Sequence, residues 1–426
     1  MKFSVITPEH TKDNLPFLKE LYDSLLIQTY KDWEWIVYCN GVTVDEIKFC
    51  DDERVVWSDE IREHERVYLN EKSIGDVKNA AASLATGDII VEVDHDDKLH
   101  PDCLEELFKV YSTEPQVGFV YTNCLYMPEP GQEFHPFQER MGWTHHYEAW
   151  HDSTSGDTGV VTHSFPVTSK SVGQIWWAPD HVRSWRKTLY DSIGGYNPED
   201  WSCDDLDLLI RTYLSGTEMR HIPKSLYYYR VTGSNNSLTV RNEHIQNNCI
   251  DKFRNNVTNL ALAEAGRRNL AAIELGGGDS TWPGFTNIDL RHGDIKHDLN
   301  DGIPFEDNSV GVIRAWHILE HLHDKQKIIE ECWRVLAHGG WLLVEVPSTD
   351  GRGAFQDPTH VSYWNSNSFW YYYRQDKAKF LPPSPVRFQH YDTANYDWGD
   401  NIIATRVALV ALKDPDGERF PGELLI

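Results

Sequence analysis

The stretch that decides the fold is IIVEVDHDD, residues 89–97. Its apolar, β-branched beginning predicts a buried strand, and the strand ends in Asp94, Asp96 and Asp97. Carboxylates this close repel one another, so the pattern is typical of a site where a divalent cation with phosphate oxygens neutralises them. A solvated acidic turn is the alternative for these residues taken alone. The surrounding sequence therefore decides between the two interpretations.

That surrounding sequence alternates predicted strands with predicted helices. Strands are expected at residues 2–7, where Pro8 ends the run, and at residues 33–38. Apolar residues spaced along one helix face predict a helix over 15–28, and an alanine-rich segment predicts another over 76–85. The carboxylates thus lie at the carboxyl end of a strand in a parallel sheet, which is where open α/β sheets bind ligands.

Over about residues 1–240 the sequence resembles the family 2 glycosyltransferases of the GT-A fold. The resemblance rests on the order of VITP (5–8), SLLIQTY (24–30), KNAA (78–81), DHDD (94–97), IGGY (193–196) and DDLDLLIR (204–211). It implies an α/β enzyme that transfers a sugar from a UDP- or GDP-type nucleotide sugar to a glycan acceptor.

The resemblance also implies a role for the acidic residues. Asp94 and Asp96 would hold Mn²⁺ or Mg²⁺ on the donor diphosphate, and Asp97 would assist them or only cap the turn. Asp205 would be the general base for an inverting transfer, with Asp204 as the alternative. The dipole of a helix beginning here is the purely structural explanation for the last two acids.

Five further positions are implied to contact the nucleotide sugar: Thr7, Pro8, Asn40, Lys78 and Asn79. Asn40 stands where the family usually has an aspartate that contacts the base, so the identity of the base stays open. Thr232 stands where relatives often have a histidine. Residues 125–175, rich in glycine, proline and histidine and holding two tryptophans, are interpreted as an acceptor loop.

Over about residues 260–415 the chain resembles class I S-adenosylmethionine-dependent methyltransferases. The motifs are AAIELGGGD (271–279), TNID (286–289), HDLN (297–300), WHILEHL (316–322) and GGWLLVEVP (339–347). By that resemblance Gly276 and Gly278 would pass under the methionine end of S-adenosylmethionine, Asp289 would bind the ribose hydroxyls, and Asp298 would lie near the adenine. Only 13 positions separate Gly276 from Asp289, so the usual first helix is expected to be missing.

His317 and His321 share the i, i+4 spacing of a zinc-binding helix. The zincin pattern needs a glutamate directly after the first histidine, and Ile318 stands there. The resemblance to methyltransferases explains the segment better, so the zinc interpretation is rejected. Asp357 and His360 follow the next predicted strand. Each is a candidate proton acceptor or an ordinary turn residue.

Composition sets the outer limits on function. A net charge of −26 makes binding to nucleic-acid phosphates unfavourable. No apolar run approaches the roughly 18 residues of a membrane span, and no apolar signal region precedes Pro8. Seven cysteines without a Cys-x-x-Cys motif indicate a reducing compartment, so a cytoplasmic location is expected.

The predicted architecture is two α/β domains. A GT-A glycosyltransferase domain is expected at 1–240, a helical connector at 241–268 and a Rossmann-like methyltransferase domain at 269–426. The interpretation is a bifunctional enzyme that transfers a sugar and methylates a glycan. Three alternatives stay open: a glycosyltransferase with a non-catalytic scaffold domain, a non-catalytic glycan-binding protein, and sugar transfer to a modified DNA base, which the acidity disfavours.

Overall fold

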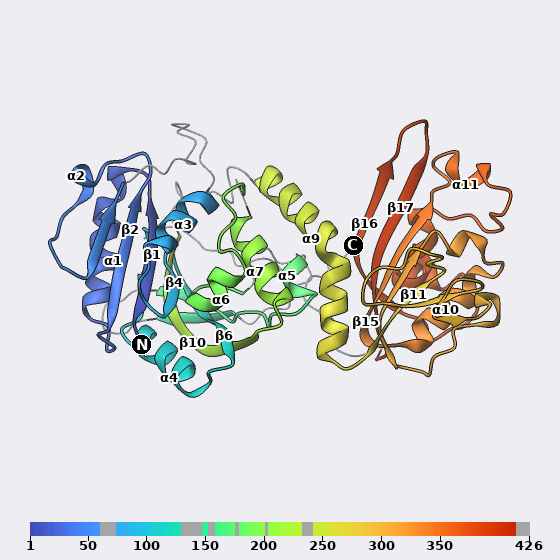
Figure 1. Cartoon of the computed structure of the whole chain (residues 1–426), viewed down its shortest axis with the longest axis horizontal. Helices are drawn as coiled ribbons and strands as arrows, with labels where there is room; N and C mark the ends of the chain where they lie inside the picture. Colours follow the sequence, from blue (N-terminus) through green and yellow to red (C-terminus); the bar gives the residue numbers. More distant parts are fainter. Residues whose placement is uncertain are drawn as a thin grey trace. The chain divides into compact units, whose positions relative to one another are not determined.

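The computed structural model describes residues 1–59, 74–128, 147–151, 158–174, 179–200, 203–231 and 242–414 (Figure 1). It divides into two compact units, here called the N-terminal unit and the C-terminal unit. The first ends at Asn255 and the second begins at Asn256. Both residues lie in α9 (Asn242–Arg267), the polar helix that forms where the connector is expected.

The N-terminal unit is built on a mixed sheet with the strand order β3-β2-β1-β4-β9-β6-β10-β5, and β7 and β8 form a hairpin beside β6. β1, β2, β3 and β4 run parallel, while β9 lies antiparallel between β4 and β6. The elements are β1 (Phe3–Glu9), η1 (Lys12–Asn14), α1 (Leu15–Leu26), β2 (Trp33–Cys39), α2 (Val44–Ile47), β3 (Val55–Ser58), α3 (Ile74–Ser83), β4 (Ile89–Glu92), β5 (Lys98–Leu99), α4 (Cys103–Thr113), β6 (Val117–Pro128), β7 (Tyr147–His151), β8 (Thr158–Thr162), α5 (Ser171–Gln174), β9 (Arg183–Arg186), α6 (Lys187–Ser192), α7 (Asp204–Leu214) and β10 (Glu218–Val231).

Helices cover both faces of this sheet. Phe3 and Val5 of β1 pack with Leu18 of α1 in one buried cluster, to which α4 also contributes. Ile6 faces the other way and packs with α3, including Ala81, and with α7. Because neighbouring side chains of a strand point to opposite faces, β1 serves both cores, and a strand buried on both sides reads as a continuous apolar run.

The C-terminal unit is a seven-stranded sheet with the order β13-β12-β11-β14-β15-β17-β16. Its strands are parallel except for β17, which lies antiparallel between β15 and β16. The elements are β11 (Ala271–Leu275), β12 (Thr286–Asp289), β13 (Ile295–Lys296), η3 (Leu299–Asp301), β14 (Val310–Trp316), η4 (Leu319–His321), α10 (Lys325–Val335), β15 (Leu336–Pro347), α11 (Gly353–Gln356), η5 (Ser366–Phe369), α12 (Trp370–Tyr373), α13 (Gln375–Ala378), β16 (Phe388–Asp397) and β17 (Ile403–Ala411).

Between β11 and β12 the structure has turns and no helix, as the short spacing predicts. Residues 276–285 alone connect these two neighbouring parallel strands. α10 packs Ile329 and Cys332 against the buried core of the sheet. The expected α/β class and two-domain fold are therefore confirmed.

Three local expectations need comment. Pro8 does not end β1, whose pairing with β2 continues to Glu9. Pairing with β4 stops at Ile6, so beyond it β1 is hydrogen-bonded on one side only, and a residue without an N–H is tolerated. Thr232 lies outside the described residues, as do residues 129–146, 152–157 and 175 of the acceptor loop. No helix in the described part of the chain is long and apolar enough to cross a membrane.

The cysteine expectation is partly wrong. Cys203 and Cys249 form a disulfide, whereas five other cysteines are free. The two cysteines lie 46 positions apart in the sequence, so spacing alone gave no reason to pair them.

Candidate functional site

The acidic segment that follows β4 holds one buried structural carboxylate and two half-buried ones. Asp97 is only 2% exposed. Its Oδ2 accepts a hydrogen bond of 2.7 Å from the Tyr227 hydroxyl, and its Oδ1 accepts one of 2.7 Å from the Arg230 backbone N–H. Asp97 therefore ties the end of β4 to β10. Burial, followed by the charges of Asp96 and Asp94, raises the pKa of Asp97 well above its usual value.

Asp94 and Asp96 are half-buried at the same strand end. Burial raises the pKa of Asp94, Lys78 and His181 partly oppose the rise, and Asp96 adds to it. A carboxylate with a raised pKa in acidic surroundings is short of positive charge, which a divalent cation would supply. Two carboxylates are also the number that a Mg²⁺ or Mn²⁺ bound to a diphosphate usually takes from a protein. The residues present therefore fit the expected metal.

A buried lysine lies at the centre of the neighbouring charge cluster. Lys78 of α3 is 3% exposed, and its Nζ lies 2.6 Å from Glu92, 2.9 Å from Asp205 and 3.1 Å from Asp204. Glu92 is the last residue of β4 and is fully buried. The lysine thus joins a helix, a strand and the beginning of α7. Its three carboxylate partners raise its pKa well above the usual value against the effect of burial.

Arg183 of β9 completes the cluster. Its guanidinium donates a hydrogen bond of 2.6 Å to Asp205 and lies 3.7 Å from Glu92. Burial alone would raise the pKa of Asp205, but Lys78 and Arg183 hold it well below the usual value. The pKa of Asp204 is raised instead, by burial and by Asp205.

The two neighbouring acids therefore differ in pKa and in access. Asp205 is ionised at neutral pH, and 27% of its side chain is exposed, against 9% for Asp204. The structure brings Lys78, a predicted donor contact, together with Asp204 and Asp205, the candidate bases, and the motifs did not predict this grouping. Glu92 and Arg183 were not anticipated either. The signal for Glu92 was present, since it is an acid inside an otherwise apolar buried strand.

The remaining predicted donor contacts lie along the ends of β1 and β2 and on α3. Thr7 is fully buried and accepts a hydrogen bond of 2.9 Å from the Trp35 indole, so it also supports the sheet. Pro8 and Asn40 are half-buried at the carboxyl ends of their strands, and Asn79 is half-buried on α3. Their contact with a nucleotide sugar stays a prediction.

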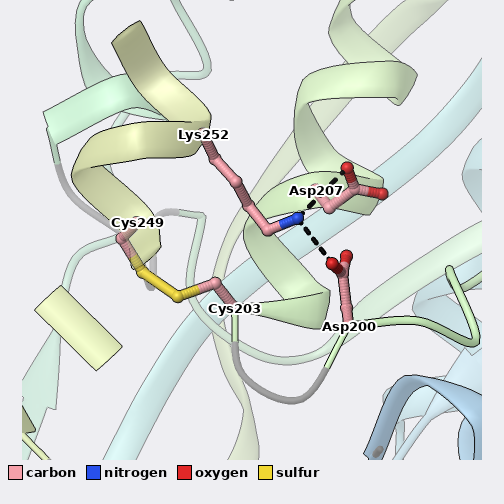
Figure 2. Close-up of a disulfide and its surroundings, with 5 residues drawn as sticks. All are labelled: Asp200, Cys203, Asp207, Cys249 and Lys252. Atoms are coloured by element: carbon pink, nitrogen blue, oxygen red, sulfur yellow. Dashed lines mark hydrogen bonds and ion pairs between the residues drawn. A yellow bond between two sulfur atoms is a disulfide. The ribbon is translucent and has the colours of Figure 1, made fainter. Parts of the chain in front are cut away.

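A disulfide and an ion-pair network hold the beginning of the helix that carries the two acids (Figure 2). Cys203 directly precedes α7 and is bonded to Cys249 of α9. Lys252, one turn further along α9, lies 2.7 Å from Asp200 and 3.5 Å from Asp207. These contacts fix α7 at the end where Asp204 and Asp205 stand.

In the C-terminal unit, β11 runs into the glycine turn predicted to bind S-adenosylmethionine. Gly276 and Gly278 have φ of +65° and +55°, a region that favours glycine. A Cβ on Gly276 would come within 2.5 Å of the Ile318 side chain. The Asn287 side chain accepts from the Gly277 N–H at 3.0 Å and donates to the Gly278 carbonyl at 2.9 Å. Asn287, which sequence reasoning missed, therefore fixes the shape of the turn.

Asp289 ends β12 beside this turn. Its Oδ1 accepts hydrogen bonds from the backbone N–H groups of Arg291 and His292, at 2.7 and 2.9 Å. Burial opposes them, but these bonds and one from the Gly278 N–H lower its pKa, so the carboxylate is ionised at the glycine turn. Asp298 is exposed and accepts from the Asn300 backbone and side chain, both at 2.9 Å. Its place near an adenine stays a prediction.

Comparison with known proteins agrees with the two units. Residues 4–165 match the family Glycosyl transferase family 2, and residues 261–344 match a Methyltransferase domain family. A probable S-adenosylmethionine-dependent methyltransferase of Mycolicibacterium smegmatis is 33% identical over 86 residues, which is 19% of this chain and 32% of the relative. Glycosyltransferase GlyA of Streptococcus pneumoniae is 24% identical over 241 residues, which is 54% of this chain and 30% of GlyA.

The crystal structure of S. aureus TarS 1–349 in complex with UDP-GlcNAc is similar at 18% identity and a TM-score of 0.39, covering 55% of this chain and 60% of that chain. The matched segments span about a third or less of the length of the curated relatives named above.

Proposed function

We propose that this chain, in which residues 4–165 match Glycosyl transferase family 2 and residues 261–344 match a methyltransferase domain, adds a sugar to a glycan and methylates the same glycan. The proposed donor is a nucleotide-diphosphate sugar. Two consecutive steps on one acceptor benefit from tethering, because the second domain then meets the product at high effective concentration.

One observation carries the sugar-transfer proposal: Lys78 acts on both halves of the site. It forms ion pairs with Asp204 and Asp205, and its charge also lowers the pKa of Asp94. The proposed base and the proposed metal ligand therefore share one electrostatic environment. An inverting transfer needs an ionised, accessible carboxylate as the base, here Asp205, and a carboxylate that can bind the metal ion, here Asp94.

In the proposed reaction, Asp205 accepts the proton of the acceptor hydroxyl. The hydroxyl oxygen bonds to the anomeric carbon, the bond from that carbon to the diphosphate oxygen breaks, and the nucleoside diphosphate leaves with the electron pair. A divalent cation bound by Asp94 and Asp96 would neutralise charge on the leaving diphosphate. Lys78 and Arg183 orient Asp205 and keep it ionised before the acceptor binds.

Calorimetry with a panel of UDP- and GDP-sugars tests the donor site. We expect one donor to bind with Mn²⁺ and to bind weakly with a chelator. Asp94→Asn and Asp96→Asn should weaken Mn²⁺-dependent binding, whereas Asp102→Asn, at an exposed position, is the matched control. Equal affinity in Mn²⁺ and in chelator would contradict the metal role.

The methylation proposal rests on Asp289 lying at the glycine turn. Asp289→Ala removes an acceptor that the ribose diol would use, so affinity for S-adenosylmethionine should fall about ten- to hundred-fold, since an unpaired buried polar group costs roughly 1–3 kcal/mol. The exposed Asp301→Ala variant is the control. If the unaltered protein gives no heat with millimolar S-adenosylmethionine or its demethylated product, the scaffold alternative replaces this half of the proposal.

Two other expectations stay as predictions. The alternative of a purely glycan-binding protein is disfavoured, because the chain keeps Asp94, Asp96 and Asp205. The cytoplasmic location depended on unpaired cysteines, and the Cys203–Cys249 pair removes part of its support.

A further inference from the structure

We propose that the C-terminal unit holds one divalent transition-metal ion between Glu320, His321 and His360. One possible ligand atom from each of these residues lies within 4.8 Å of those of the other two. Glu320 and His321 belong to η4, after β14, and His360 follows α11, after β15. Two imidazoles and one carboxylate are the donor set of zinc, iron and manganese sites rather than of magnesium or calcium sites.

In the described part of the chain Glu320 has one ion-pair partner, His317, but its oxygens accept no hydrogen bond of good geometry. The side chain of Glu320 is 3% exposed, and neither of its oxygens makes a hydrogen bond there. His317 Nδ1 lies 3.5 Å from one of them, at the limit of hydrogen-bonding distance, and His317 also pairs with Glu345 at 2.8 Å. Carboxylate oxygens that are buried without a good hydrogen bond are costly, and a bound metal ion would satisfy them.

The hydrogen bonds of the two histidines leave Nε2 of each ring as the possible ligand atom. His360 Nδ1 lies 2.9 Å from the Ala354 carbonyl, which can only accept, so Nδ1 carries the proton and Nε2 has a free lone pair. The side chain of His360 is 7% exposed, so this nitrogen is held inside the protein.

His321 also carries its proton on Nδ1, because of a short chain of hydrogen bonds. The Thr359 hydroxyl donates to Asp357 at 2.7 Å, so it must accept from His321 Nδ1, 3.1 Å away. The Thr359 carbonyl, 3.2 Å from the same nitrogen, is a second acceptor. Metal-binding histidines usually donate their other ring N–H to a carbonyl or a carboxylate-linked group, which fixes the tautomer.

The backbone holds the two segments together. The Glu320 carbonyl accepts from the N–H groups of Val361 and Ser362, at 2.8 and 3.0 Å. Three ligands can thus be in place before the ion binds. This grouping differs from the rejected zinc pair of His317 and His321, since His360 comes from a segment 39 positions away.

The cluster borders the cofactor turn, because Ile318, which contacts Gly276, stands two residues before Glu320. Three protein ligands leave a coordination position open, as in catalytic rather than structural metal sites. On the proposed methyl-transfer function, this position would take an oxygen of the acceptor. Metal binding itself does not depend on that function.

Titration of tag-free, chelator-treated protein with Co²⁺ tests the site by visible absorption and by calorimetry. A second possible cluster, Glu9, His10 and His95, and the proposed site at Asp94 and Asp96 lie in the N-terminal unit, so all proteins carry His10→Gln and Asp94→Asn. We expect one Co²⁺ bound through nitrogen and oxygen donors. His360→Gln and Glu320→Gln should weaken it by more than the roughly ten- to hundred-fold typical of a lost outer-shell partner.

Thr359→Val should weaken Co²⁺ binding about ten-fold, the lower end for a lost outer-shell partner, since it removes the hydroxyl partner of His321 and leaves the Thr359 carbonyl. His323→Gln, at an exposed neighbouring histidine, should bind as the parent does. Unchanged binding in both His360→Gln and Glu320→Gln would overturn the proposal, as would the absence of Co²⁺ binding in the parent. The affinity for S-adenosylmethionine is measured separately in chelator. Cofactor binding without Co²⁺ binding would refute only the metal site, whereas Co²⁺ binding without cofactor binding would refute only the methyltransferase function. If one variant does not fold, the other and Thr359→Val still decide.

Discussion

Replacing Lys78 with methionine should destabilise the N-terminal unit far more than loss of an ordinary salt bridge. Methionine keeps most of the side-chain volume but leaves Glu92, Asp204 and Asp205 without their shared cation. Breaking a buried ion pair from one side costs about 3–5 kcal/mol, because the remaining charge is buried without compensation. Lys98→Met is the matched control: its ion pair with Glu20 is 3.4 Å long and partly exposed, so about 0–1 kcal/mol is expected.

The pH dependence gives this prediction a second readout. Lys78 helps hold the folded-state pKa of Asp205 below its unfolded value, so the stabilisation is present above about pH 4 and is lost as the pH falls through the folded pKa. The deficit of Lys78→Met should therefore be nearly the same at pH 7 and pH 4 and should shrink at about pH 2. Urea unfolding at the three pH values measures it. A deficit at pH 7 no greater than that of Lys98→Met would refute the assignment of Lys78 as the centre of the cluster.

Three further outcomes are expected. Reduction of the Cys203–Cys249 disulfide, which separates 46 positions, should cost the N-terminal unit roughly 4 kcal/mol by loop entropy; Cys203→Ser should match the reduced protein in a urea melt, and an unchanged midpoint would contradict this. Asn287→Ala should remove two turn hydrogen bonds worth about 1 kcal/mol each and weaken S-adenosylmethionine binding, whereas equal affinity in calorimetry would show that the turn does not need it. Burial raises the pKa of Glu34, but its hydrogen bonds outweigh burial and lower the pKa below the unfolded value. Glu34 therefore stabilises the fold above about pH 4.5, and this stabilisation is lost as the pH falls. Glu34→Gln should lack this pH-dependent loss of stability in acid unfolding.

Local pattern was sufficient to predict much of the fold. The apolar run ending in Asp94 forms β4, the Asp204 segment begins α7, and the short Gly276-to-Asp289 spacing removes a helix. Each of these features depends on neighbours in sequence. Periodicity and turn chemistry report such features directly.

The contacts that organise the sites could not be predicted in the same way. Lys78 meets Asp204 across 126 positions, and His360 meets His321 across 39. Their proximity follows from strand order, which a single sequence does not display. Lys78 illustrates the consequence: the motif suggested a contact with the nucleotide sugar, whereas its ammonium is fully engaged with three carboxylates.

The most direct test of the central claim compares Asp205→Asn with the unaltered protein on the donor identified by calorimetry. Release of nucleoside diphosphate in Mn²⁺ is followed with and without a glycan acceptor, and donor affinity is measured for both proteins. The account predicts nearly equal affinity, with release about 10²- to 10⁴-fold slower in the variant, because only proton transfer in the transition state is lost. Equal rates of release in the two proteins would contradict it, and the role of base would then pass to another group, Asp204 first.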